Sequence, residues 1–164
     1  MRTVRSSRTS AQTPLNYAYR LLAQRDYSEA RLVEKLHSKG FSSHATTATV
    51  ETLRERGHVN DTRLAVRLAE WFQNQGFGPR AIWVKLEQKG LTEGAIEEAL
   101  SGHVEQTDVG VAQRVVQRRF SSSALRDPKM RARAFRLLLR RGYSPSVVAS
   151  VLGKDRQDDY EQKE

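Results

Sequence analysis

The segment "FGPRAIWVKLEQKGL" at residues 77–91 decides the fold, because an earlier segment of the chain has the same layout. That earlier segment, "YSEARLVEKLHSKGF", occupies residues 27–41 and has the same Lys-x-x-x-Lys-Gly ending fifty residues before. A shortened third copy, "YSPSVVASVLG", begins at Tyr143. Sequence repeated at such a period is typical of tandem modules, each too small to bury its own apolar face.

Each copy carries the residues that begin and end a helix. Three residues are suited to a helix N-cap, one in each copy: Ser28, Gly78 and Ser144. In the second and third copies a proline follows at the first helical position, as Pro79 and Pro145. Apolar residues four apart then share one helix face. Gly40 and Gly90 follow the last turn, where a left-handed backbone angle ends a helix.

Extending the repeat in both directions predicts an all-α protein, an elongated and curved array of three tandem three-helix repeats. We expect nine helices, at about residues 14–25, 28–39, 43–56, 61–75, 79–89, 93–101, 108–119, 128–141 and 145–152. The predicted organisation is a disordered basic arm (1–13), repeats at 14–57, 58–102 and 103–153, and a disordered acidic tail (154–164). Residues 102–107 and 121–127 are expected to be connectors.

Composition excludes several classes of protein. The 164 residues include no cysteine, which removes disulfides, thiolate zinc sites and cysteine nucleophiles. No apolar run is long enough to span a membrane. The first residues, "MRTVRSSRTSAQTP", carry three arginines and no apolar stretch. They do not fit a secretory signal, and fit a basic arm or, as the alternative, a transit-type presequence.

The net charge of +9 is concentrated in residues 108–141, which hold 10 basic and 2 acidic side chains. On the helix expected there, one stripe is apolar and is expected to be buried against a neighbouring helix: Met130, Ala134, Leu137 and Leu138. A second stripe on the same helix is basic: Lys129, Arg133, Arg136 and Arg140. The preceding helix adds three arginines: Arg114, Arg118 and Arg119. Like charges at this spacing repel, so a passive solvated face would normally intersperse acids. The pattern favours a binding surface for nucleic acid or for an acidic protein face.

Residues that could support catalysis form no recognisable site. The four histidines have unrelated spacings, and no acidic cluster joins them as a metal site requires: His37, His44, His58 and His103. Asn60 and Asp61 follow a helix stop, so a new N-cap is favoured over a catalytic carboxylate. The glycines of "GFGPR" at 76–80 join two expected helices and not a strand to a helix. We predict no catalytic, cofactor or metal site.

Two stretches give the sequence a family resemblance. "GHVNDTRLA" at 57–65 and "GFGPRAIWVKLEQKG" at 76–90 resemble signatures of the RecX family of bacterial recombination regulators, and residues 21–41 and 136–153 resemble that family's first and last repeats. The resemblance covers about residues 15–152. The matching signature positions include Asp61, Gly76, Phe77, Gly78, Pro79, Ile82, Leu86 and Gly90, which we expect to be mainly structural. His58, Leu64 and Lys85 depart from the usual pattern.

The resemblance implies a non-enzymatic, cytoplasmic regulator of homologous recombination and the SOS response. Proteins of this family bind in the groove of the RecA nucleoprotein filament and inhibit its ATPase, strand-exchange and co-protease activities, and some also contact DNA. We therefore expect RecA as partner, single- or double-stranded DNA as a secondary one, and a monomeric chain. Contact candidates in the middle repeat are Arg63, Arg80, Lys85 and Lys89, beside the basic residues of the last repeat. The alternative is a stand-alone helical nucleic-acid-binding protein without a recombinase partner.

Overall fold

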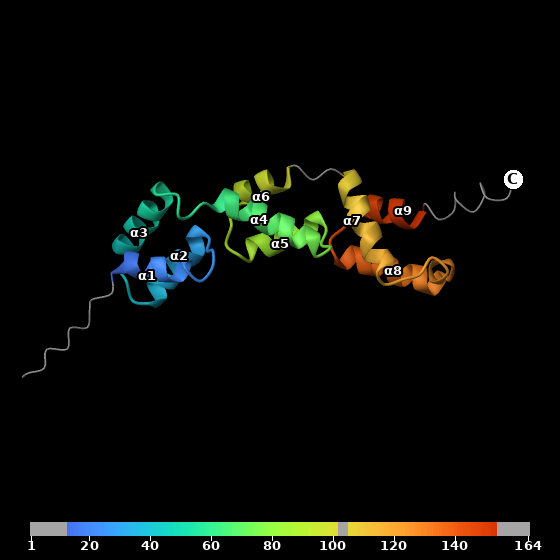
Figure 1. Ribbon diagram of the computed structural model, residues 1–164, viewed down its shortest axis with the longest axis horizontal. Helices are drawn as coiled ribbons and strands as arrows, with labels where there is room; N and C mark the ends of the chain where they lie inside the picture. The colour runs from blue at the N-terminus through green and yellow to red at the C-terminus, as the bar shows by residue number, and fades with distance from the viewer. Residues whose placement is uncertain (1–12, 102–104, 154–164) are drawn as a thin grey trace, which may run out of the picture. The chain divides into compact units, whose positions relative to one another are not determined.

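The structure, a computed structural model, describes residues 13–101 and 105–153. Over these residues it contains nine α-helices, one short 3-10 helix and no strand, which confirms the predicted all-α class (Figure 1). The elements are α1 (Pro14–Leu22), α2 (Glu29–Ser38), α3 (Ser43–Glu55), α4 (Asp61–Asn74), α5 (Pro79–Glu87), α6 (Glu93–Leu100), α7 (Glu105–Gln117), η1 (Ala124–Arg126), α8 (Pro128–Arg140) and α9 (Pro145–Gly153). They form two compact units, one ending at Leu64 and the other beginning at Ala65.

The predicted helix boundaries are confirmed where a capping residue or glycine set them. The hydroxyl of Ser28 accepts a hydrogen bond from the backbone N–H of Arg31 at 3.3 Å and so caps α2. Gly78 is the N-cap of α5, and Pro79 is its first residue. Gly90 has a φ of 77°, as the left-handed end of the preceding helix requires.

Several boundaries differ from the prediction, and α5 and α7 each end two residues early, at Glu87 and Gln117. Helix α1 ends at Leu22, three residues before the predicted end, and just past it the N–H of Gln24 donates to the carbonyl of Leu21 at 3.0 Å in a tighter turn. Helix α7 begins at Glu105, so the expected connector at 102–107 was wrong for its last three residues. The second connector contains η1, whose first residue donates its N–H to the Ser121 hydroxyl at 3.2 Å.

The first unit is built around a small apolar core from α1, α2, α3 and the turn before α4: Ala18, Leu32, Leu36, Val50, Leu53 and Val59. The rings of Tyr17 and Phe41 close one side of it, with centroids 6.0 Å apart. A polar contact then ties the start of α4 to the start of α2, since the Asp61 carboxylate accepts the N–H of Glu29 at 3.0 Å. Asp61 therefore satisfies a backbone donor that α2 cannot satisfy within itself.

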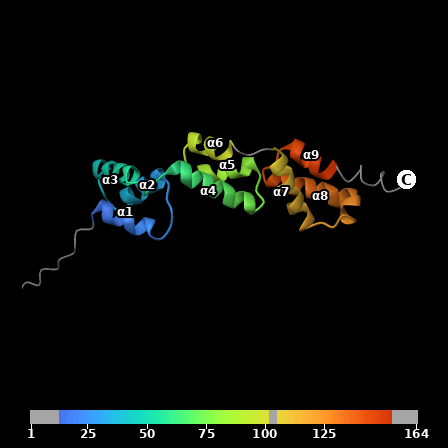
Figure 2. The ribbon, with the colours of Figure 1, turned by 45° about the horizontal axis from the view of Figure 1, so that its top comes forward.

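The second unit contains α5 to α9, and α7, α8 and α9 gather at its C-terminal end (Figure 2). These three helices and the turn before α9 share one core: Val111, Ala112, Val115, Val116, Ala134, Leu137, Leu138, Tyr143, Val147, Val148 and Leu152. Three members, Ala134, Leu137 and Leu138, come from the stripe that the sequence predicted to be buried on α8. This burial fixes which face of α8 is left to solvent.

The turn before α5 and the turn before α9 meet backbone to backbone. The N–H of Gly78 donates to the carbonyl of Arg141 at 2.7 Å, and the N–H of Arg80 donates to that of Gly142 at 3.3 Å. A Cβ on Gly78 would lie 2.7 Å from the Gly142 carbonyl, and one on Gly142 would lie 2.3 Å from the nitrogen of Ala81. A side chain at Gly78 or at Gly142 would therefore force the two turns apart.

Candidate partner and nucleic-acid interface

Helix α8 presents the basic stripe to solvent. The helix begins at Pro128, and the carboxylate of its N-cap, Asp127, accepts the N–H of Lys129 at 2.9 Å. Because Ala134, Leu137 and Leu138 are buried, the opposite side of the helix is exposed. The exposed basic residues there are Lys129, Arg133, Arg136 and Arg140.

The acidic residues of segment 108–141 do not lie on the basic stripe of α8. Residues 108–141 contain two acids, Asp108 and Asp127. Asp108 is buried on α7, and Asp127 caps α8. The positive charge of α8 is therefore not balanced by acids interspersed along its own exposed face, and it leaves a surface suited to an anionic partner.

One hollow, of about 660 Å³, gathers arginines from two elements. Arg119 and Phe120 reach it from the turn just after α7, and Met130, Arg133 and Arg140 from α8. Met130 was predicted to face a neighbouring helix, but it is 36% exposed. The prediction was wrong there because the connector, and not a helix, borders the hollow at this end of α8.

A different side of α8 is apolar and exposed. Phe135 and Leu139, four residues apart, are 41% and 38% exposed. Phe135 lines an open groove of about 720 Å³ together with Val148 and Leu152 of α9. Leu139 lines a neighbouring hollow of about 480 Å³ together with Arg136 and Arg140. This side of α8 therefore mixes apolar and guanidinium surface.

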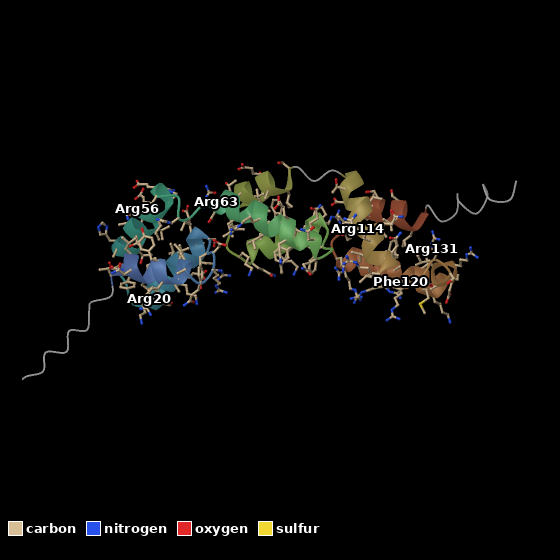
Figure 3. All side chains as sticks on the ribbon, viewed as in Figure 1. Arg20, Arg56, Arg63, Arg114, Phe120 and Arg131 are labelled. Carbon is tan, nitrogen blue, oxygen red and sulfur yellow. The ribbon has the colours of Figure 1, made fainter. Side chains whose placement is uncertain are left out.

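The arginines predicted on α7 do not form one cluster. Arg114 reaches back toward Gly110, and its charge acts on Tyr143. Burial raises the pKa of the Tyr143 hydroxyl to about 12, with the charge of Asp108 adding to the rise and Arg141 and Arg114 opposing it. Figure 3 places Arg114 apart from Phe120, which borders the arginine hollow. Arg118 is exposed, whereas Arg119 lines that hollow.

Among the candidates in the middle of the chain, Lys85 and Arg63 contact an aromatic ring and a backbone carbonyl of the fold. The Lys85 ammonium lies 4.3 Å from the ring centroid of Phe77, a cation–π distance. Arg63 donates from Nη2 to the carbonyl of Gly57 at 3.0 Å, at the end of α3. Arg80 and Lys89 are exposed. Arg63 belongs to the first unit and the other three candidates to the second.

The signature residues lie mostly at turns and in the core. Ile82 and Leu86 are fully buried, and Gly76 ends α4 with a φ of 80°. Burial raises the pKa of the Asp61 carboxyl above its ordinary value, and the hydrogen bond from Glu29 opposes this rise. The pKa of Glu29 is raised too, by burial and by the charge of Asp61.

Arg141 is a structural residue that the sequence did not single out. Its Nη1 donates to the carbonyls of Gln75 at 2.6 Å and Gly76 at 3.1 Å, just past the end of α4. Its guanidinium carbon also lies 5.3 Å from the ring centroid of Phe77. Arg141 thus satisfies backbone acceptors of the second repeat from the third, across 66 residues of sequence.

Phe120, Phe135 and Leu139 were also missed as candidates. Each lies next to an arginine in the sequence, in "RRF", "RAFR" and "LLLR". Phe135 and Leu139 fall outside the apolar stripe that the sequence predicted to be buried. Their positions on the helix therefore could have indicated that these two side chains are exposed.

Among the described residues, no group of three or more His, Cys, Asp or Glu side chains could together hold a metal ion. His37, His44 and His58 are exposed, and His103 lies outside the described residues. None of the helices in the described part of the chain is long and apolar enough to cross a membrane.

Comparison with known proteins finds the same three-part organisation along the chain. Models of the RecX family's first, second and third three-helix domains match residues 15–53, 60–100 and 106–152. A "Regulatory protein RecX" of Stenotrophomonas maltophilia (strain K279a) is 33% identical over 156 residues, which are 95% of each chain. One of Xanthomonas axonopodis pv. citri (strain 306) is 32% identical over 154 residues, 94% of each chain.

Solved structures agree on the fold. The crystal structure of RecX from Lactobacillus salivarius superimposes with a TM-score of 0.80 and 18% identity, over 87% of this chain and 94% of that one. A second crystal structure, of a regulatory protein RecX, gives a TM-score of 0.75 and 21% identity, over 87% of this chain and 74% of that one. At these identities the likeness establishes the tandem three-helix fold alone.

Proposed function

The chain belongs to the RecX family of regulatory proteins, and from this premise we propose that it binds the RecA nucleoprotein filament and inhibits it. In this proposal the chain is a monomer that acts in the cytoplasm and catalyses no reaction. It occupies the filament groove and so lowers ATP hydrolysis, strand exchange and co-protease activity, restraining recombination, DNA repair and the SOS response.

The observation that carries the proposal is the mixed surface of α8. Phe135 and Leu139 are exposed apolar side chains, with Arg136 and Arg140 beside them. Protein interfaces combine buried apolar or aromatic anchors with arginine, and such residues supply most of the binding energy. A surface of this kind fits a partner that offers an apolar pocket with acidic residues around it.

The middle repeat supplies a second set of contacts in the proposal. Arg80 and Lys89 are candidates there because their side chains are exposed. Arg63 and Lys85 already contact the carbonyl of Gly57 and the ring of Phe77, so we expect their replacement to act partly through the fold. Contacts with DNA are secondary and would come from the basic residues of the last repeat.

Steady-state ATP hydrolysis by RecA on single-stranded DNA tests the proposal. Addition of the full chain should lower the rate, and Phe135→Ala combined with Arg136→Glu should weaken inhibition about 100-fold or more. Arg20→Glu, an exposed arginine of the first unit (Figure 3), is the matched control and should inhibit like the unaltered chain. Unchanged hydrolysis while the chain is demonstrably bound to the filament would contradict the proposal.

The alternative function, nucleic-acid binding without a recombinase partner, is favoured by the arginine-lined hollow beside Phe120. Salt separates the two functions. A protein that makes about six phosphate contacts loses roughly 10³-fold in affinity for DNA between about 50 and 200 mM salt. Filament inhibition that persists at a salt concentration abolishing binding to free DNA would favour the protein partner, and parallel loss of both would favour the alternative.

A further inference from the structure

We propose that the hollow between the end of α7 and helix α8 is a subsite for single-stranded nucleic acid. Phosphates of the strand would bind Arg119, Arg133 and Arg140, and one base would lie against Phe120 and Met130. This inference rests on the secondary DNA contact of the proposed function and deepens it, since it names the strand and the residues. The protein contact uses the neighbouring side of α8, and Arg133 and Arg140 border both surfaces.

The charge of the hollow fits a run of phosphates. Three arginines line it, and its lining includes no carboxylate. Arg133 and Arg140 are seven residues apart on one helix, which separates them by about 10 Å along the axis. Two guanidinium groups at that separation contact different phosphates of one strand. Arginine also forms paired hydrogen bonds to phosphate oxygens.

The apolar part of the hollow fits a base. Phe120 is half-buried and packs against the core of α7, α8 and α9, so its ring is held in place. Met130, 36% exposed, lines the same hollow from α8. Aromatic side chains within a basic groove bind single strands because every base has a flat face that can stack.

The same features disfavour two other occupants. In duplex DNA the bases are stacked on one another, so a base cannot lie against Phe120 unless the duplex opens. An acidic peptide would match the arginines but has no need for a held aromatic ring among them. The mixed apolar surface at Phe135 and Leu139 is better suited to a protein.

Fluorescence anisotropy with the full chain and a labelled 20-residue oligo-dT tests the arginines. Arg133→Gln and Arg140→Gln should each weaken binding and lower the slope of log affinity against log salt by about 0.7, the contribution of one phosphate on a single strand. Arg20→Gln, in the first unit, should change neither quantity. Unchanged slopes in both hollow variants would overturn the proposal.

An oligonucleotide that keeps its phosphates but lacks bases tests Phe120. The unaltered chain should bind this abasic strand about tenfold more weakly than oligo-dT. Phe120→Leu should bind oligo-dT about tenfold more weakly with an unchanged salt slope, and should no longer distinguish the two strands. Because the abasic strand is used with the unaltered chain, this arm does not depend on the variant folding correctly. Equal binding of both strands by the unaltered chain would refute the base contact.

A competition experiment distinguishes single-stranded nucleic acid from other possible occupants of the hollow. Duplex DNA of equal length and polyglutamate should displace oligo-dT only at higher concentration; equal displacement by either one would overturn the assignment. The result is also distinct from the proposed function. Loss of oligonucleotide binding in Arg133→Gln with RecA inhibition intact supports two separate surfaces. Intact oligonucleotide binding without RecA inhibition would contradict the proposed function and leave the subsite standing.

Discussion

The first and third repeats have the same three-helix plan, but they differ in the acidic side chains that accompany their arginines. In the first repeat Arg31 forms an ion pair with Glu34 at 2.5 Å, and Arg54 forms one with Glu51 at 3.6 Å. In the third, residues 108–141 contain only Asp108, which is buried, and Asp127, which caps a helix. The three-helix plan therefore sets the core and the turns, and leaves the charge of the exposed faces free to vary from one repeat to the next.

The two units also differ in how their turns are held. Among positive-φ glycines, Gly57 in the first unit has open space around the position of a Cβ. Gly142 in the second faces the backbone of Ala81 at 2.3 Å. A glycine can thus be needed for its backbone angle alone, or for the angle and the close approach together, and only the structure tells the two apart.

The largest effect that we predict comes from Gly142→Ala. The change adds the strain of a positive φ to a clash with the backbone of Ala81, and should lower the free energy of unfolding of the second unit by about 3 kcal/mol. Urea unfolding followed by tryptophan fluorescence measures this, because both tryptophans, Trp71 and Trp83, lie in that unit. Gly57→Ala, followed by circular dichroism, should cost only about 1 kcal/mol in the first unit. Equal losses would contradict the distinction.

A smaller loss is expected for Arg141→Gln. The shorter side chain gives up the charged hydrogen bonds to Gln75 and Gly76 and the contact with Phe77. We expect the second unit to lose about 1 kcal/mol, measured as a shift of the urea midpoint. Arg140→Gln is the neighbouring control and should stay within about 0.5 kcal/mol. If the two variants unfold alike, the bridge from Arg141 has no measurable role.

The Asp61 contact predicts a pH dependence in the first unit. The pKa of Asp61 and the pKa of Glu29 are both raised, so the folded chain holds protons more tightly than the unfolded chain. Stability from these groups is fully present below their ordinary pKa values and is lost as pH rises through the raised ones. Lowering the pH from 7 toward 4 should therefore stabilise the natural chain relative to Asp61→Asn. Urea midpoints at several pH values measure the difference, and a constant difference would argue against the raised pKa values.

The smallest effect should follow from removing the acids of the first repeat. Glu34→Gln with Glu51→Gln breaks both exposed ion pairs and should change the free energy of unfolding by less than about 0.5 kcal/mol per pair. Oligonucleotide affinity should stay within about twofold, because freed arginines on an exposed helix face remain solvated. An increase in oligonucleotide affinity as large as the decrease expected for Arg133→Gln would show that net charge, and not the hollow, governs binding.

Local sequence was enough for the helices and for one face of α8. The N-cap at Ser28, the turn at Gly78 and Pro79, and the buried positions Ala134, Leu137 and Leu138 all follow from spacing and capping chemistry. These features depend on residues within a few positions of one another, so a periodic reading finds them.

Contacts between distant segments could not be read from the sequence. The hydrogen bond from Glu29 to Asp61 spans 32 residues, and that from Arg141 to Gln75 spans 66. Likewise, the clustering of Arg119, Phe120 and Arg133 at one hollow depends on how the end of α7 meets α8. The sequence identified a basic region, but the angle between two helices decides which of its members share a surface.

The mutual fit of Gly78 and Gly142 has a consequence for anyone who recombines such modules. Two loops that touch through bare backbone must be inherited or transplanted as a matched set, since a bulkier loop on either side forces the other away. A chimaera that exchanges only the last module between homologues should therefore succeed or fail on its loop residues, whatever the quality of its interior.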